Sequence, residues 1–305
     1  MQATCAAIDW GTTRFRIWAL DRRGAVVAER QSDRGMSTLK PADYEAVLEN
    51  VMSEIGATAD LPAIICGMAG SAQGWKEAPY ADLPALPGTI AGAAVRVPSD
   101  SRDIRILPGL AQRDPSCPDV MRGEETLILG VTLSGMNQGT ICLPGTHSKW
   151  VRIVQGAVTE FHTTMTGELY ALLSRQSTLS HMIKDADAVD CEHPCFIEGV
   201  RQAVARPHSV AGALFSTRAA PLLHLATGED MAARLSGLLI GLELAGMLPQ
   251  LNDKKTDEIT LVSQGPLARL YDRALGLAGM NVRTLDSDDM VRAGLFSAAK
   301  TLWPL

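Results

Sequence analysis

The fold of this chain is decided close to its start, by the stretch Ile8-Asp9-Trp10-Gly11-Thr12-Thr13-Arg14-Phe15-Arg16. Apolar runs lie on both sides of a short turn of small residues, which is the pattern of a β-hairpin with a polar tip. Gly11 would let a ligand approach the backbone, while Thr12 and Thr13 would add hydroxyl groups to a nest of N–H donors. Asp9 could hold a magnesium ion. The stretch predicts a phosphate-binding hairpin, with an ordinary turn as the alternative.

The composition is that of a globular α/β protein. The chain has 305 residues, 46% of them hydrophobic, and a net charge of −6, so a nucleic-acid partner that needs a basic surface is not expected. No signal peptide or membrane span is expected, because the best apolar run, residues 235–248, is short and carries Glu243. Three of the six cysteines, Cys5, Cys66 and Cys142, lie in apolar strand-like runs and are interpreted as reduced core residues, and a cytoplasmic location is expected.

The opening pattern returns in the second half of the chain. Residues 139–143 predict a strand, residues 144–149 a glycine-hydroxyl turn, and residues 150–154 and 157–161 two further strands. The second turn has no acidic counterpart of Asp9, which would leave the metal to the first loop. We expect the second turn to bind phosphate through a set that mixes amides, hydroxyl groups and a cation: Gly145, Thr146, His147, Ser148 and Lys149. In such a loop His147 is interpreted as a hydrogen-bond donor rather than a catalytic histidine.

Other segments of the chain also allow structural or functional predictions. A helix is expected over residues 119–130, where Glu124 and Glu125 are either catalytic carboxylates or helix caps. The glycine-rich loop 67–75 is either a substrate wall or an ordinary connection. Small residues in a helix expected at 231–248 predict close packing against a sheet, and residues 253–257 predict a charged loop. Cys191-Glu-His193-Pro-Cys195 is too loosely spaced, and has no second ligand cluster, to predict zinc.

Two strand-turn-strand phosphate loops and a late strand that ends in a small-residue loop resemble the actin-like sugar kinase superfamily. Longer motifs are similar to those of the 2-dehydro-3-deoxygalactonokinase family, and they extend over essentially the whole chain: Asp9-Trp-Gly-Thr-Thr with Arg16, Cys66-Gly-Met-Ala-Gly-Ser71, Gln73-Gly-Trp75, Val120-Met-Arg-Gly-Glu-Glu-Thr126, Leu143-Pro-Gly-Thr-His-Ser-Lys-Trp150 and Met165-Thr-Gly-Glu168. The resemblance implies an α/β fold of two RNase H-like domains with a cleft between them. Residues 1–134, with a C-terminal helix at about 288–305, would form the sugar-binding domain, and residues 135–287 the nucleotide-binding domain.

The same resemblance implies an activity and its cofactors. The family uses ATP and Mg²⁺ to phosphorylate O6 of 2-dehydro-3-deoxy-D-galactonate in galactonate catabolism. Gln264 and Gly265 would belong to the adenosine loop, which has one glycine where many relatives have two. The partners would be the sugar acid and ATP, without nucleic acid or membrane, and a homodimer is allowed. The motifs alone do not determine the configuration at C4 of the sugar acid.

Roles follow for the individual side chains. Phosphoryl transfer needs a base for the attacking hydroxyl, for which Glu124 is the first choice, Glu125 the second and Asp9 a poorer alternative. Arginine suits the substrate carboxylate, and Arg16 and Arg122 are the candidates. The remaining expected substrate contacts are Trp10, Ser71, Gln73 and Trp75. Two rival functions stay open: a phosphatase of the same superfamily in which Glu124 activates water, and a nucleotide-switched scaffold without enzymatic activity.

Overall fold

The computed structural model describes residues 2–183, 189–252 and 258–305. The chain forms two compact units. Unit 1 comprises Met1–Gln138, Ile153–Phe161 and Ser287–Leu305, and unit 2 comprises Gly139–Arg152 and His162–Asp286. The domain boundaries expected at 134/135 and 287/288 stay a prediction, and the structure also assigns residues 153–161 to unit 1. The charged loop expected at residues 253–257 lies outside the described residues.

A six-stranded sheet of order β3-β2-β1-β4-β7-β6 is the centre of unit 1. Its strands are β1 (Cys5–Trp10), β2 (Phe15–Leu20), β3 (Val26–Ser32), β4 (Ala63–Gly67), β6 (Val95–Val97) and β7 (Ile104–Ile106). β1 pairs antiparallel with β2, so the predicted hairpin is confirmed, and β2 pairs antiparallel with β3, which extends the hairpin to a meander of three strands. On its other side β1 pairs parallel with β4, and β4 with β7.

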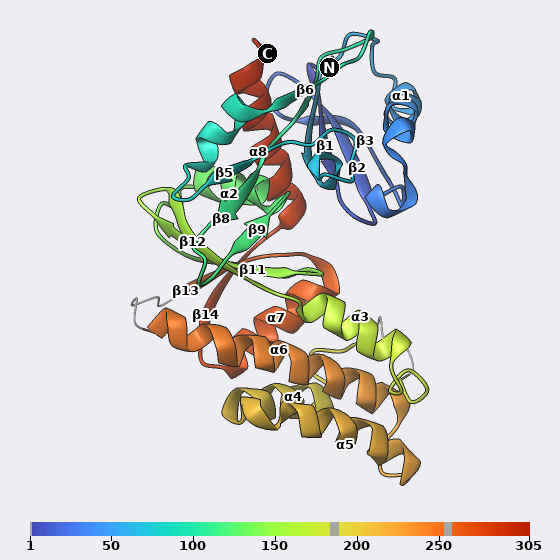
Figure 1. The fold of residues 1–305 in the computed structure, drawn as a ribbon, viewed down its shortest axis with the longest axis vertical. Helices are drawn as coiled ribbons and strands as arrows, with labels where there is room; N and C mark the ends of the chain where they lie inside the picture. Colours follow the sequence, from blue (N-terminus) through green and yellow to red (C-terminus); the bar gives the residue numbers. More distant parts are fainter. Residues whose placement is uncertain (1, 184–188, 253–257) are drawn as a thin grey trace. The chain divides into compact units, whose positions relative to one another are not determined.

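Both faces of this sheet are covered, which explains the continuous apolar run of β1. Ala6, Ile8 and Trp10 face the cluster that contains α1 (Tyr44–Glu54), whereas Cys5 and Ala7 face the cluster built on α8 (Ser287–Leu302). α8 packs against α2 (Glu124–Leu133), as Figure 1 shows. This contact requires glycine, because a Cβ on Gly294 would lie 2.0 Å from the carbonyl oxygen of Thr126.

The helix expected over residues 119–130 begins later than the sequence suggested. Asp119–Met121 form strand β9, which pairs with β8 (Gly109–Gln112), and β8 pairs with β5 (Tyr80–Asp82). Gly123, with φ +107°, then turns the chain into α2 at Glu124. The prediction was wrong at this end because strand pairing with β8 is a tertiary contact. Short 3-10 helices complete unit 1: η1 (Met36–Thr38), η2 (Pro41–Asp43), η3 (Met68–Gly70) and η4 (Pro87–Ala93).

A second sheet, most of which lies in unit 2, repeats the strand order of the first. It has the order β12-β11-β10-β13-β14, which matches β3-β2-β1-β4-β7 position by position. The strands are β10 (Gly139–Leu143), β11 (Ser148–Val154), β12 (Ala157–Thr164), β13 (Glu258–Val262) and β14 (Asn281–Leu285). The parallel pairs β10–β13 and β13–β14 correspond to β1–β4 and β4–β7. The internal repeat predicted from the two turns is therefore confirmed in the topology.

Unit 2 carries more helix than unit 1. Its helices are α3 (Thr166–Gln176), α4 (Pro194–Ala205), η5 (Pro207–Ser209), α5 (Val210–Leu222), α6 (Gly228–Asn252) and α7 (Gly265–Leu277). α6 lies beside α4 and α5 (Figure 1), and its glycines allow close packing on α4, since a Cβ on Gly237 would lie 2.2 Å from the carbonyl oxygen of Phe196. Ala233, Ile240 and Leu244 of the same helix share a buried cluster with residues of β10 and β13, so α6 also packs against the sheet, as expected. By length and composition α6 could cross a membrane, but 72% of that stretch is buried inside the protein, as in a core helix.

Candidate active site

The first loop is the tip of the β1–β2 hairpin. The strands pair up to Trp10 and Phe15, and the Gly11 N–H donates to the carbonyl oxygen of Arg14 at 2.9 Å. Residues of η1 hold the loop from outside: the Met36 N–H donates to Gly11 O (3.0 Å), and the Ser37 N–H and hydroxyl donate to Thr12 O (both 2.9 Å). These bonds use carbonyl groups, so they fix the loop without consuming the N–H groups of Thr12 and Thr13.

Asp9 and Arg16 face each other at the base of this hairpin. Arg16 Nη2 lies 2.5 Å from Asp9 Oδ2, and its Nη1 forms an ion pair with Asp288 in the first turn of α8. Arg16, predicted as a substrate contact, is therefore engaged by two carboxylates and orients Asp9. The other Asp9 oxygen, Oδ1, accepts a weak hydrogen bond from the Cys66 thiol at 3.8 Å.

The glycine-rich loop follows β4, the parallel neighbour of β1, so both loops leave the same edge of the sheet. Trp75 in this loop stacks on Tyr44, with ring centroids 5.8 Å apart, and meets the Trp10 ring edge-on at 6.1 Å. Trp10 is fully buried and its Nε1 donates to the Arg34 carbonyl oxygen at 2.9 Å. The Trp10 ring therefore offers no surface to a substrate. Two other predicted contacts are more accessible, the half-buried Ser71 and the exposed Gln73.

Glu124 and Glu125 begin α2 and differ sharply in environment. Glu125 is fully buried; its Oε2 accepts from the Gly123 N–H at 2.6 Å and its Oε1 from the Thr126 hydroxyl at 3.1 Å. Burial, with the nearby Glu124 charge as a second cause, raises the pKa of Glu125 to about 8. Glu124 is half-buried and its Oε2 accepts from the Arg122 N–H at 3.0 Å. Both carboxylates lie in the first turn of α2 and accept from backbone N–H groups just before the helix, but only Glu124 keeps surface exposure, so the alternative of helix caps on a solvated surface does not describe Glu125.

The guanidinium group of Arg122 uses only some of its hydrogen-bond donors. One guanidinium nitrogen, Nη2, donates to Ala78 O at 2.8 Å, and the group lies 4.3 Å from the centre of the Tyr80 ring. Its Nε and Nη1 are buried and find no hydrogen-bond partner among the described residues. Buried donors without partners are costly, so this guanidinium suits an anionic ligand.

The second loop joins β10 to β11 and is packed against the start of α3. A Cβ on Gly167 would lie 2.3 Å from the Gly145 carbonyl oxygen, so only glycine allows this approach. The Glu168 N–H donates to Thr146 O at 2.9 Å, and the Glu168 carboxylate lies 2.5 Å from Nε2 of His147. α3 therefore holds the predicted phosphate loop through its backbone and through His147.

Ser148 and Lys149 begin β11 and are both buried. The Ser148 hydroxyl bonds with the Tyr271 hydroxyl at 2.9 Å and is turned into the core of unit 2. The Lys149 side chain is 4% exposed, yet it has no hydrogen-bond or ion-pair partner among the described residues. Its ammonium nitrogen is not among the fully buried polar atoms without a partner, so it keeps solvent contact at this loop and could meet an anion there.

The predicted adenosine loop lies at the same edge of the sheet as the second phosphate loop. β10 and β13 pair in parallel, β10 leads into residues 144–147, and β13 leads into Gln264 and Gly265. Gly265 has φ +62° and begins α7, and both loop residues are exposed. The carboxyl ends of parallel strands are the usual ligand-binding edge of an α/β sheet.

His193, Cys195 and Asp230 form the cluster of possible metal ligands among the described residues. His193 Nδ1 accepts from the Cys195 N–H at 3.2 Å, and Asp230 Oδ2 accepts from the Thr227 N–H at 2.6 Å. These bonds cap α4 and α6. The bond to Nδ1 places the proton of the neutral ring on Nε2, which faces Asp230 at 3.5 Å, and a protonated nitrogen has no lone pair for a metal.

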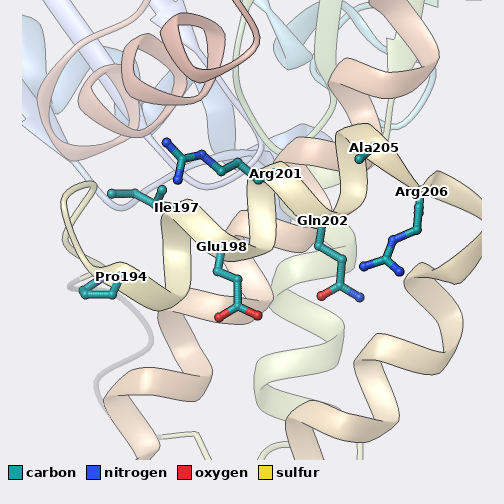
Figure 2. A pocket seen from close by; sticks show the side chains of 7 residues that line it. All are labelled: Pro194, Ile197, Glu198, Arg201, Gln202, Ala205 and Arg206. Atoms are coloured by element: carbon teal, nitrogen blue, oxygen red, sulfur yellow. The ribbon is translucent and has the colours of Figure 1, made fainter.

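Figure 2 shows a shallow groove on the exposed side of α4. Every residue that lines it belongs to α4 or directly follows it: Pro194, Ile197, Glu198, Arg201, Gln202, Ala205 and Arg206. None of them is a predicted site residue. A groove formed by one helix does not enclose a ligand, so the candidate site stays with the loops at the sheet edges.

Comparisons with known proteins agree with this arrangement. The model of the 2-keto-3-deoxy-galactonokinase family matches residues 9–298. The chain belongs to that family. It is 48% identical to the "Probable 2-dehydro-3-deoxygalactonokinase" of Rhizobium meliloti (strain 1021) and 34% identical to the 2-dehydro-3-deoxygalactonokinase of Escherichia coli (strain K12), with 98% of each chain covered in both cases. A crystal structure from Sinorhizobium meliloti with the same kinase name matches with a TM-score of 0.94 and 47% identity, and covers 99% of this chain and 97% of that one.

Membership in the family makes the chain a sugar kinase and confirms the resemblance and the fold class predicted from the motifs. The phosphatase and the scaffold are not favoured. Sequence reasoning missed three residues that the structure connects to the predicted loops: Asp288, Tyr271 and Glu243. Glu243 could have been recognised from the sequence as a lone charged residue within an apolar helix. Its hydrogen-bond partners could not, because they are far away in the sequence.

Proposed function

We propose that the protein transfers the γ-phosphate of ATP to O6 of 2-dehydro-3-deoxy-D-galactonate and yields the 6-phosphate, as a cytoplasmic enzyme of galactonate catabolism. In this reaction the O6 hydroxyl loses its proton to a base, the new P–O6 bond forms, and the bond from the γ-phosphorus to the bridging oxygen breaks as ADP leaves. The family and the names of two full-length relatives support the substrate. Six free cysteines fit a reducing compartment.

One observation supports nucleotide binding in unit 2 most strongly. The Lys149 side chain is 4% exposed and has no hydrogen-bond or ion-pair partner among the described residues, and it follows a loop that α3 approaches closely at Gly167. A phosphate group would supply the missing counter-charge, while the N–H groups of Thr146 and His147 could donate to its oxygens. Gln264 and Gly265, at the neighbouring strand end, would meet the adenosine.

In unit 1 Asp9 would hold Mg²⁺, and Gly11, Thr12 and Thr13 would meet the γ-phosphate. The donor set fits a hard cation, because a carboxylate oxygen is the ligand that Mg²⁺ prefers and Asp9 is only partly buried. When bound, the ion neutralises charge on the phosphate oxygens. Arg16 orients the Asp9 carboxylate through the 2.5 Å ion pair.

We assign the base to Glu124. A base must reach the hydroxyl proton, and Glu124 is the partly exposed member of the pair, whereas Glu125 has no exposed surface. A carboxyl with a pKa of about 8 is also mostly protonated near pH 7 and cannot accept a proton in that form. Arg122, with two unpartnered buried nitrogens, would meet the substrate carboxylate, next to Ser71, Gln73 and Trp75.

The test is a panel of keto-deoxy sugar acids that differ at C4, supplied with ATP and Mg²⁺. ADP release and the phosphorylated acid are measured together. The proposal expects one phosphorylated acid per ADP and the highest kcat/KM for the galactonate-derived acid. ADP release without a phosphorylated acid, or a clear preference for the gluconate-derived epimer, would overturn it. The oligomeric state, for which the sequence allows a homodimer, is measured on the same sample by light scattering.

A further inference from the structure

Glu243 is a buried carboxylate in the middle of α6, 5% exposed. Three side chains donate to it: Trp150 Nε1 to Oε1 at 2.8 Å, the Tyr271 hydroxyl to Oε2 at 2.7 Å, and the Thr166 hydroxyl to Oε2. Because the Tyr271 hydroxyl donates to Glu243, it accepts from the Ser148 hydroxyl at 2.9 Å. The network therefore contains four donors that end on one carboxylate.

Each member of this network belongs to an element that borders the proposed nucleotide site. Ser148 and Trp150 lie on β11, directly after the second phosphate loop. Thr166 is the first residue of α3, the helix whose next two residues contact Gly145, Thr146 and His147. Tyr271 lies on α7, which begins at Gly265 in the predicted adenosine loop. One side chain thus joins the supports of both loops.

Fold stability alone does not account for this arrangement. A buried carboxylate loses its hydration, and a well-packed apolar residue in its place is often equally stable or more stable. What three charge-assisted hydrogen bonds supply is a fixed distance between the elements that they join. We propose that Glu243 is a positioning residue that holds the second phosphate loop and the adenosine loop in the geometry that binds ATP. This inference rests on the proposed nucleotide role of unit 2.

The test compares two variants of the network in steady-state kinetics. Tyr271→Phe removes one hydroxyl without changing charge or packing, and Glu243→Gln replaces an acceptor oxygen by an NH₂ group that must face donors. Loss of a hydrogen bond to a charged group corresponds to about tenfold or more in an equilibrium constant. We expect the KM for ATP and the Kd for ADP to rise by about that factor in each variant. The KM for the sugar acid stays unchanged. Should Glu243→Gln not fold, Tyr271→Phe decides alone.

Glu49→Gln is the matched control, because Glu49 is also a carboxylate held by buried donors, here from Arg102 in unit 1. It should lower the melting temperature without changing the KM for ATP. Lys149→Met separates the two hypotheses. If Lys149→Met raises the KM for ATP while both network variants only lower the melting temperature, the inference on Glu243 is wrong and the nucleotide site stands. If Lys149→Met leaves the KM for ATP unchanged, the nucleotide site is wrong and the inference on Glu243 with it.

Discussion

Replacing Glu125 by Gln should stabilise the protein, and more so at higher pH. The carboxyl is fully buried, and its pKa rises from 4.5 to about 8 on folding. At a pH between these two pKa values, Glu125 keeps its proton in the folded protein and loses it in the unfolded chain. The free energy of unfolding therefore falls as pH rises, by about 1.4 kcal/mol for each pH unit. Over the pH range between the two pKa values, the free energy of unfolding falls by about 5 kcal/mol. The amide of Glu125→Gln does not titrate, so the variant does not lose this free energy.

The hydrogen bonds of Glu125 change little in this variant. The amide oxygen can still accept from the Gly123 N–H, and the NH₂ group can donate to the Thr126 hydroxyl. At pH 5 the two proteins should therefore differ by less than about 1 kcal/mol, the size of one altered hydrogen bond. By pH 8 Glu125→Gln should be the more stable protein by several kcal/mol, up to about 5 kcal/mol.

Urea unfolding from pH 5 to pH 9 measures this difference. Glu49→Gln serves as the control, because hydrogen bonds from Arg102 lower the pKa of Glu49. The stability that Glu49 contributes is complete above its unfolded pKa and is lost only as pH falls through its folded pKa, so the Glu49→Gln difference should be flat over the same range. If the stability difference between Glu125→Gln and the wild type is equally independent of pH, Glu125 is ionised over the whole range, and burial does not raise its pKa.

Three substitutions probe the proposed roles more directly. Arg122→Ala should raise the KM for the sugar acid by about tenfold or more, and much less for an uncharged analogue, as steady-state kinetics with both substrates would show; equal effects would contradict the carboxylate contact. Glu124→Gln should lower kcat by a factor of about 10² to 10⁴ with little change in ADP affinity by calorimetry; a larger loss in Glu125→Gln would transfer the base to Glu125. Gly167→Ala should raise the KM for ATP, because the new Cβ would lie 2.3 Å from Gly145 O and displace the loop; unchanged ATP kinetics would mean that α3 does not position it.

Much of the fold could be predicted because it depends on local patterns. The two glycine-hydroxyl turns predicted both hairpins, and each hairpin supplies two adjacent strands of a sheet with the same strand order. The helices expected at residues 231–248 and at about 288–305 lie within a few residues of α6 and α8. The start of α2 was misplaced because Asp119–Met121 become a strand only by pairing with β8, a contact that no local pattern reports.

The candidate site was predicted as a set of residues, without their partners. Arg16 could be recognised as a cation near Asp9. The sequence does not show that Arg16 also pairs with Asp288, which lies 272 positions later. Trp10 belonged to a long motif and was therefore expected at the substrate, whereas the structure buries it against Phe15 and Tyr44. A motif marks residues that occur together, and it does not distinguish those that touch a ligand from those that pack beneath it.

The amino-acid sequence by itself determined the family, the two loops and the chemistry that they can perform, because glycine, threonine, lysine and aspartate carry their donors and charges wherever they lie. Only the tertiary structure decided what each of these groups experiences. Burial raises the pKa of Glu125, whereas its neighbour Glu124 stays partly exposed, and Lys149 has no counter-charge among the described residues. These differences arise from solvation and from partners distant in the chain, which exist only after the sheets and helices have packed.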